Sequence, residues 1–171
     1  MAVGSVQITG TGQLIQLNRR LRAAGGPPLR QNMARRIRRA AEPLRNDLQD
    51  TMRGLTISST GRSSGKRGGP SPTTRPLRAT IAAAIRISVR TSGNPGARVW
   101  IDYSSLPPDL RGMPKVINTG RIRHPVFGNR RRWATQTATP LWWDKTVRRH
   151  EPRMRAEVAR VVDDVRRQLG G

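Results

Sequence analysis

The chain has 171 residues, enough for one domain with a hydrophobic core, but only 35% of them are hydrophobic and 4% are aromatic. It carries 33 Lys and Arg residues against 10 Asp and Glu, and this formal net charge of +23 predicts anionic partners. The sequence has no cysteine, which excludes disulfides and thiolate metal sites, and its longest apolar run, IAAAI, is too short to span a bilayer.

The N-terminal third predicts an arm followed by two helices. We expect residues 1–12 to form an N-terminal arm, and their alternating apolar residues allow a short strand within it. Leucines at helical spacing predict a first helix over residues 13–24, ended by two glycines. A second helix is predicted over residues 29–55, with a kink or break at Pro43. Its apolar stripe consists of Met33, Ile37, Ala41, Leu44, Leu48 and Met52.

A basic, low-complexity segment follows these helices. Residues 58–76 consist mainly of Ser, Gly, Pro, Thr and Arg, which predicts a flexible loop with no apolar surface to bury. Lys66 and Arg67 lie in this loop. Such a segment is able to become ordered against a neighbouring molecule, so we regard its basic residues as candidates for an interface.

The middle of the chain predicts a small antiparallel sheet. A short helix around residues 77–85 leads into two strands, at 85–90 and 97–103, which alternate apolar and polar residues around an Asn-Pro-Gly turn. The segment RIRHPVFGN, residues 121–129, is expected to supply a third strand. Helices combined with a small antiparallel sheet indicate an α+β fold, and we expect all 171 residues to form a single domain.

Apolar residues at helical spacing, from Trp143 to Val165, predict a long C-terminal helix. Thr139 is the predicted N-cap of this helix, with Pro140 at its first position. Pro152 should kink the helix or separate a short first helix from the long one.

The segment HPVFGNRRRWATQ, residues 124–136, combines a turn, three arginines and a tryptophan. We expect its Phe-Gly-Asn sequence to reverse the chain and its tryptophan to fold back over the sheet. The predicted packing residues are Phe127, Trp133, Trp142 and Trp143. The predicted surface for a protein or DNA partner consists of Arg130, Arg131 and Arg132 at this tip, with Lys66 and Arg67 of the loop.

The sequence offers no constellation of catalytic or metal-binding residues. Its two histidines, His124 and His150, are isolated from each other and have no cysteine to assist them. Glycine-rich stretches lack the strand–loop–helix frame of a phosphate loop. Acidic side chains lie three or four residues from arginines on the predicted helices, so ion pairs within a helix explain Asp47, Asp50, Asp163 and Asp164. We therefore expect no enzyme, no metal and no cofactor.

Several motifs, in their order along the chain, resemble the neck or tail-completion proteins of long-tailed, siphovirus-type phages, in the version found in actinobacterial phages. The C-terminal motifs are His-Pro-x-Phe-Gly at 124–128, Trp-x-x-Gln at 133–136, Pro-x-Trp at 140–142 and the closing helix. LNRRLRAAG, AAEPLRNDLQ and PLRATIAAAIRISV follow the family's order in the first half. The resemblance covers residues 13–168, although TTRPLRATI has Arg-Pro where the family often has Gly.

This resemblance implies a virion structural protein that forms a ring, commonly of six copies, at the head–tail junction. Its expected partners are other copies of itself, connector or stopper proteins on the head side, and the tail-tube or tail-terminator protein on the tail side. DNA would pass through the lumen of the ring.

Two alternatives to a neck ring stay open. The first is a tail terminator that caps the tail tube, and the second, from another class, is a basic protein that binds nucleic acid without sequence preference. The first residues lack the basic and apolar regions of a signal peptide. We therefore expect synthesis in the cytoplasm of a bacterial host and a final location in the virion, with no membrane partner.

Overall fold

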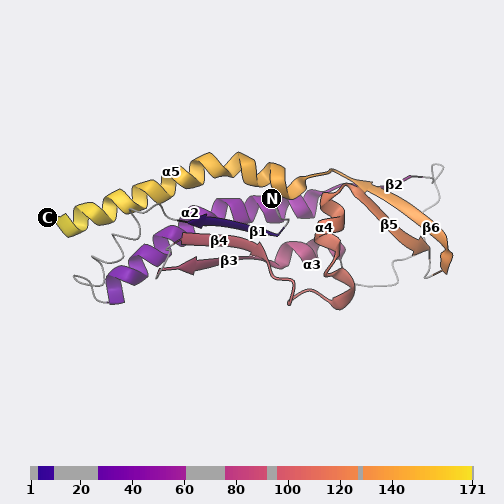
Figure 1. Ribbon diagram of the computed structural model, residues 1–171, viewed down its shortest axis with the longest axis horizontal. Coiled ribbons are helices and arrows are strands. Elements are labelled where there is room, and N and C mark those ends of the chain that lie inside the picture. The colour runs from indigo at the N-terminus through magenta and orange to yellow at the C-terminus, as the bar shows by residue number, and fades with distance from the viewer. Residues whose placement is uncertain (1–3, 10–26, 61–75, 92–95, 127–128, 171) are drawn as a thin grey trace.

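The structure of the protein is a computed structural model, and it describes residues 4–9, 27–60, 76–91, 96–126 and 129–170. The helix predicted over residues 13–24 lies outside the described residues, as does most of the predicted 58–76 loop. The described chain is α+β, as the sequence predicts: two long helices form one layer, and an antiparallel sheet lies against them (Figure 1).

The long helices are α2 (Pro27–Gly54) and α5 (Trp142–Gly170), which pack side by side. The apolar stripe predicted on α2 is fully buried, from Met33 to Met52. Pro43 and Pro152 both lie inside continuous helices, so of the two predicted alternatives, a kink or a break, the break is excluded at both prolines. A proline removes one backbone hydrogen bond, and in both helices the buried apolar stripe continues on either side of it. In Figure 1, α2 changes direction along its length.

The first sheet has the strand order β1-β4-β3, and all its pairings are antiparallel. Its strands are β1 (Ser5–Thr9), β3 (Ile85–Arg90) and β4 (Gly96–Ile101). The predicted hairpin of β3 and β4 is confirmed, with Ile85 opposite Ile101 and Val89 opposite Ala97. Residues 5–9 of the predicted N-terminal arm form its third strand. The inner face of this sheet packs on α2 and completes the core.

A second three-stranded sheet is a correction to the single sheet expected from the sequence. Its order is β2-β6-β5, with strands β2 (Ile57–Thr60), β5 (Arg121–Val126) and β6 (Asn129–Ala138). The RIRHPV segment is a strand, but it joins this sheet instead of the β3–β4 hairpin. Residues 58–60, predicted to belong to the flexible loop, also form part of a strand, because they pair with residues 135–137 in the C-terminal half of β6.

Short elements connect the two sheets. They are α3 (Leu77–Ala83), the 3-10 turn η1 (Pro108–Leu110) and α4 (Met113–Asn118). Asn118, at the end of α4, fixes the start of α5: its side-chain oxygen accepts from the backbone N–H of Trp143 at 3.1 Å, and its Nδ2 donates to Asp144 Oδ2 at 2.9 Å. Its carbonyl accepts from the N–H of Leu141 at 2.8 Å. The prediction that Thr139 caps this helix is wrong, because α5 begins at Trp142. Asn118, which lies outside the helix, accepts the N–H of Trp143, which has no acceptor within the first turn.

Candidate functional site

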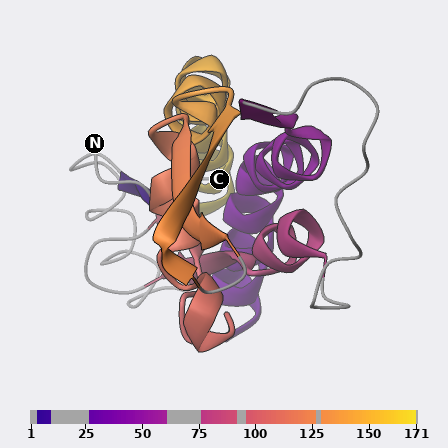
Figure 2. The same cartoon turned by 90° about the vertical axis from the view of Figure 1, so that its right-hand side faces the viewer.

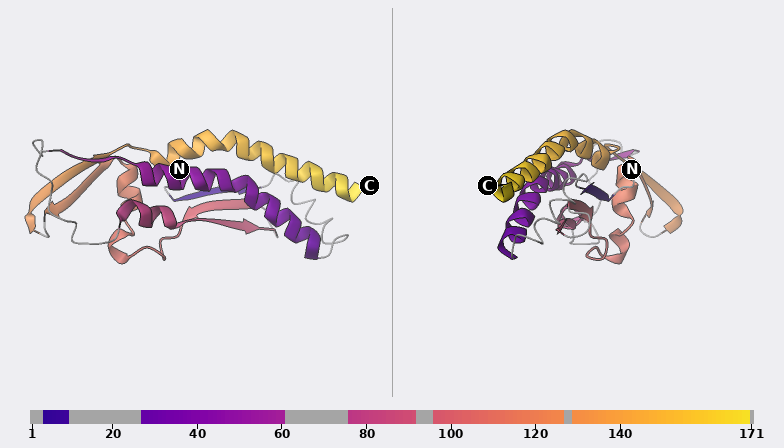
Figure 3. Two further views of the ribbon diagram at one scale, coloured as in Figure 1. Left: turned by 180° about the vertical axis from the view of Figure 1, so that it is seen from behind. Right: turned by 60° about the vertical axis from the view of Figure 1, so that its left-hand side comes forward.

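The β2-β6-β5 sheet projects from the body of the molecule. Figure 1 and the left view of Figure 3 show β5 and β6 extending beyond the end of α2 and the start of α5, and Figure 2 shows the sheet from its own end. No side chain of β6 is buried, and Ile122 of β5, only 3% exposed, lies in the main core. Among its described side chains, the sheet has no separate core, and such a small sheet gains little stability from its strands alone.

Arginine dominates the surface of this projecting sheet. The three strands contain no Asp or Glu. Five arginines on β5 and β6 are exposed: Arg121, Arg123, Arg130, Arg131 and Arg132. Guanidinium groups bind carboxylates and phosphates through paired hydrogen bonds. The projecting sheet is therefore a candidate surface for an anionic or carboxylate-bearing partner.

The three consecutive arginines occupy a bulge in β6. The register pairs Pro125 with Trp133 but the next residue, Val126, with Asn129, so Arg130–Arg132 have no counterpart on β5. A bulge of this kind bends its strand and turns side chains away from the regular pleat. The structure thus presents the predicted tip, Arg130–Arg132, as an exposed and outward segment of the projecting sheet.

Hydrogen bonds within the bulge fix its backbone. The N–H of Arg131 donates to Asn129 Oδ1 at 2.9 Å, and the indole Nε1 of Trp133 donates to the carbonyl of Arg130 at 2.8 Å. On β5, the guanidinium of Arg123 lies 5.0 Å from the centroid of the Trp133 ring. These contacts fix the backbone of the bulge and hold the Arg123 guanidinium against the Trp133 ring, which reduces the entropy lost when a partner binds there.

Trp133 itself corrects a prediction from the sequence. Its side chain is 49% exposed on the projecting sheet, so it does not pack over the core with the other two tryptophans. Period-two alternation places a residue on a face of a strand but does not say whether another layer covers that face. No helix in the described part of the chain covers this face, and the exposed ring becomes a feature of the candidate surface.

The other predicted site residues divide between the core and the undescribed segments. Trp142 and Trp143 are 2% and 1% exposed, and their rings meet edge to face with centroids 5.6 Å apart. Phe127, Lys66 and Arg67 lie outside the described residues. Of the predicted surface, the structure therefore describes only Arg130–Arg132, which it places beside Trp133.

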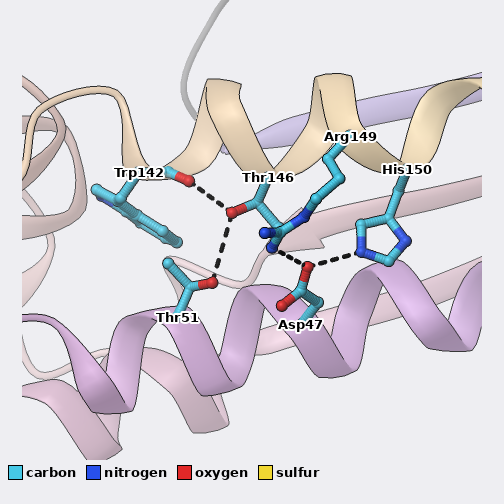
Figure 4. A network of polar contacts seen from close by, with 6 residues as sticks. All are labelled: Asp47, Thr51, Trp142, Thr146, Arg149 and His150. Atoms are coloured by element: carbon cyan, nitrogen blue, oxygen red, sulfur yellow. Dashed lines mark hydrogen bonds and ion pairs between the residues drawn. The ribbon is translucent and has the colours of Figure 1, made fainter.

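A polar network that sequence reasoning missed joins α2 to α5 (Figure 4). Asp47 of α2 accepts hydrogen bonds from His150, with Nε2 and Oδ2 2.6 Å apart, and from Arg149. Partial burial acts to raise the pKa of Asp47, but the hydrogen bonds from His150 and Arg149 outweigh it and hold the pKa below its ordinary value of 3.8. One turn further, Thr51 and Thr146 hydroxyls lie 3.5 Å apart, and Thr146 donates to the carbonyl of Trp142.

The acidic residues thus behave in two ways. Asp50 pairs with Arg53 three residues on, and Asp164 pairs with Arg167, as ion pairing within a helix predicts. Asp164 also accepts from Arg36 of α2 at 2.5 Å. Asp47 and Asp164 therefore connect the two helices, and no short-range pattern encodes those contacts because they depend on how the helices face each other.

Two open grooves lie along the seam between α2 and α5, with volumes of about 420 and 370 Å³. Lys145 and Arg149 line the first groove beside several threonines, and four arginines line the second together with Glu157 and Asp164. Among the described residues, no group of three or more His, Cys, Asp or Glu side chains is arranged to hold a metal ion. Within the same described residues, no helix has the length and apolar character needed to cross a membrane.

Comparisons of the chain with family models, with curated proteins and with solved structures find no match.

Proposed function

We propose that this chain is a structural subunit of a phage virion, which assembles into a ring at the head–tail junction as a neck or tail-completion protein. The observation that carries the proposal is the projecting β2-β6-β5 sheet, which has five exposed arginines, a half-exposed Trp133 and no core of its own. The order of the sequence motifs supports a neck or tail-completion protein, and the projecting sheet supports contacts between subunits.

A projecting sheet supports ring formation for a geometric reason. A contact between two different surfaces of identical subunits repeats around an axis and closes into a ring when the rotation allows it. The β2-β6-β5 sheet, called the projecting arm from here on, is suited to such a contact. It reaches away from the subunit body and can therefore meet a different surface on the next copy. Tryptophan and arginine are also the residues that most often dominate the binding energy of protein interfaces.

Action through binding rather than catalysis is part of the proposal. Several described acidic side chains, among them Asp47, Asp50 and Asp144, are engaged in ion pairs or capping contacts, and four arginines line one of the two grooves between α2 and α5. A tail terminator at the end of the tail tube would use the same arm, so it stays an alternative within the same class. Neighbouring rings would then be the partners above and below.

The number of complete phage particles tests whether the β2-β6-β5 sheet takes part in assembly. Changing Arg130, Arg131 and Arg132 to Ala should leave the subunit folded, because all three side chains are exposed, but should reduce the number of complete particles at least tenfold. The assay is complementation of a phage that lacks this gene, with plaque counts and electron microscopy of the lysate. We expect heads and tails that fail to join.

A matched control removes the same charge elsewhere. Arg35, Arg38 and Arg39 are also exposed, but they lie on α2. Their replacement by Ala should leave the yield within about twofold of the wild type, since exposed positions outside an interface change little. Normal yield from the arm variant, or an equal loss from both variants, would count against a role of the arm in assembly.

A further inference from the structure

The outer face of the β1-β4-β3 sheet is a second basic surface, distinct from the projecting sheet. The strand register places Ser5, Trp100 and Arg86 in one row across the sheet and Gln7, Arg98 and Ser88 in the next. Arg90 follows, opposite Gly96. The inner face of the same strands carries the buried residues Ile85, Val99 and Ile101, which face α2. Alternation therefore directs the three arginines to the side away from the helices, where all three are exposed.

The charge on this outer face is almost entirely of one sign. The three strands contain no Asp or Glu. Asp102, just after β4, accepts hydrogen bonds from the hydroxyl of Ser104 at 2.5 Å and from its N–H at 3.2 Å, and the nearby charge of Arg86 also helps to hold its pKa below 3.8. Counting Asp102 against the three arginines leaves the face with a net charge of 3 − 1 = +2.

Arg98, at the centre of this face, is held in place before any ligand binds. Its Nε donates to Ser5 Oγ at 3.0 Å, and its guanidinium carbon lies 5.3 Å from the centroid of the Trp100 ring. Within the described residues, these contacts involve one nitrogen and the flat face of the guanidinium, which leaves the terminal amino groups available to a ligand. Because Arg98 already covers the indole, Trp100 acts as a support for the cation and is not a free platform for stacking bases.

The spacing of the cations favours a partner with regularly repeated charge. Residues diagonal to each other on neighbouring strands lie about 7–8 Å apart, which applies to Arg98 relative to Arg86 and to Arg90. The intervening exposed side chains, Ser5, Gln7 and Ser88, are polar and carry no negative charge. Duplex DNA presents such a repeating row of phosphates, and arginine is suited to bind them in pairs of hydrogen bonds.

We propose that the outer face of the β1-β4-β3 sheet binds the phosphate backbone of double-stranded DNA without sequence preference. The assignment goes beyond the proposed function, because it names a DNA-binding surface separate from the projecting arm and holds whether or not the subunit forms rings. Contacts to phosphate position a protein on DNA without reading bases, and the three cations of this face are suited to contacts of that kind.

The test measures DNA binding by the purified full-length protein as a function of salt. Fluorescence anisotropy with two unrelated labelled duplexes should give equal affinities, both of which fall steeply as the salt rises from about 50 to 200 mM. The variant Arg86→Gln, Arg90→Gln, Arg98→Gln should lose about three phosphate contacts, which lowers the slope of log K against log salt by about 2.7. At the lowest salt, its affinity should fall at least tenfold.

Two variants with the same loss of charge serve as controls. One changes Arg35, Arg38 and Arg39 to Gln on α2, and the other changes Arg130, Arg131 and Arg132 to Gln on the projecting arm. Both should retain most of the salt slope. If the triple sheet variant does not fold, the single changes Arg86→Gln and Arg90→Gln leave the Arg98–Trp100 pair intact, and each should lower the slope by about one.

Three results would overturn the assignment. One is wild-type binding by the sheet variants, and the second is an equal loss from either control, which would show a general effect of net charge. The third is preference of the wild-type face for poly-glutamate over DNA in competition, which would indicate an acidic protein partner. Ring formation is measured separately, so failure of the DNA assignment leaves the proposed function standing, and the reverse also holds.

Discussion

A few partly buried polar residues determine how the elements of this chain meet. Asn118 is one of them, since its side chain and carbonyl together engage the first turn of α5 through Leu141, Trp143 and Asp144. Its amide is buried, and so is the carboxylate of Asp144. Removing one partner of a buried polar pair leaves the other without a hydrogen bond, which costs more than the pair contributes when it is intact.

We predict that Asn118→Ala destabilises the fold by about 2–3 kcal/mol, because it removes the cap of α5 and leaves Asp144 without its amide donor. Chemical denaturation followed by circular dichroism measures the change. Asn46→Ala is the matched control, since Asn46 is exposed and accepts hydrogen bonds only from the neighbouring Arg45 among the described contacts. A loss of under about 0.5 kcal/mol from Asn118→Ala would show that the cap is not structural.

Asp47 gives a prediction about pH. Its pKa in the folded protein lies below the ordinary 3.8, so the unfolded chain binds a proton more readily than the folded one. The contribution of Asp47 to stability is therefore complete well above pH 3.8 and is lost as the pH falls through that value toward the lower folded pKa. In Asp47→Asn, the free energy of unfolding should fall less steeply between pH 5 and pH 3, about the range of this titration.

The matched control for Asp47 is Asp50→Asn. Asp50 is on the same helix, but it is largely exposed, and within the described part of the chain it forms an ion pair with Arg53 of the same helix. Its replacement should leave the acid dependence of the wild type nearly unchanged. Identical pH profiles for the wild type and Asp47→Asn would contradict the role given to the α2–α5 network.

At the scale of elements, the projecting sheet and the core should respond differently to the loss of a tryptophan. Trp143→Ala should cost about 3–5 kcal/mol, because it removes a fully buried ring from the core. Trp133→Ala should cost under about 1 kcal/mol, because the ring is half exposed and contacts mainly Arg123 and its own strand. Thermal unfolding of the two variants measures both losses of stability. Equal losses would show that Trp133 contributes to the core as much as Trp143 does.

The elements differ in how far the sequence predicts them. α2 and α5 follow from apolar stripes that repeat every turn, and the β3–β4 hairpin follows from alternation around a short turn, because both signals are local. The pairing of β2 with β6 joins residues 57–60 to 135–138, which no local pattern encodes. The composition of residues 58–60 favoured a loop, and their strand exists because β6 has an edge available to them.

The candidate site could likewise be predicted only in part, because part of it depends on contacts between distant segments. The sequence predicted the exposure of Arg130–Arg132 correctly from their charge, whereas the bulge that presents them depends on the register between β5 and β6. It placed Trp133 in the core because tryptophan is usually well buried, and the absence of a covering layer is a property of the whole fold. The Asp47–His150 contact likewise depends on the rotation of two helices that are distant in sequence.

At the scale of the whole molecule, charge and shape point in the same direction. A net charge of +23 opposes the compact state of an isolated subunit through self-repulsion, and the projecting sheet exposes an aromatic ring and five cations. Both features agree with the two proposals, that neighbouring copies bind the projecting sheet and that DNA binds the outer face of the first sheet. As proposed, the chain would act as one part of an assembly.

Native mass spectrometry of the purified protein, with negative-stain microscopy of the same sample, tests this account most directly. We predict closed rings of one defined copy number, commonly six in the family that the sequence resembles, at concentrations in the micromolar range and above. The variant with Arg130, Arg131 and Arg132 changed to Ala should remain folded and monomeric. A wild-type protein that is monomeric at every concentration, or rings that persist unchanged in the arm variant, would contradict the account.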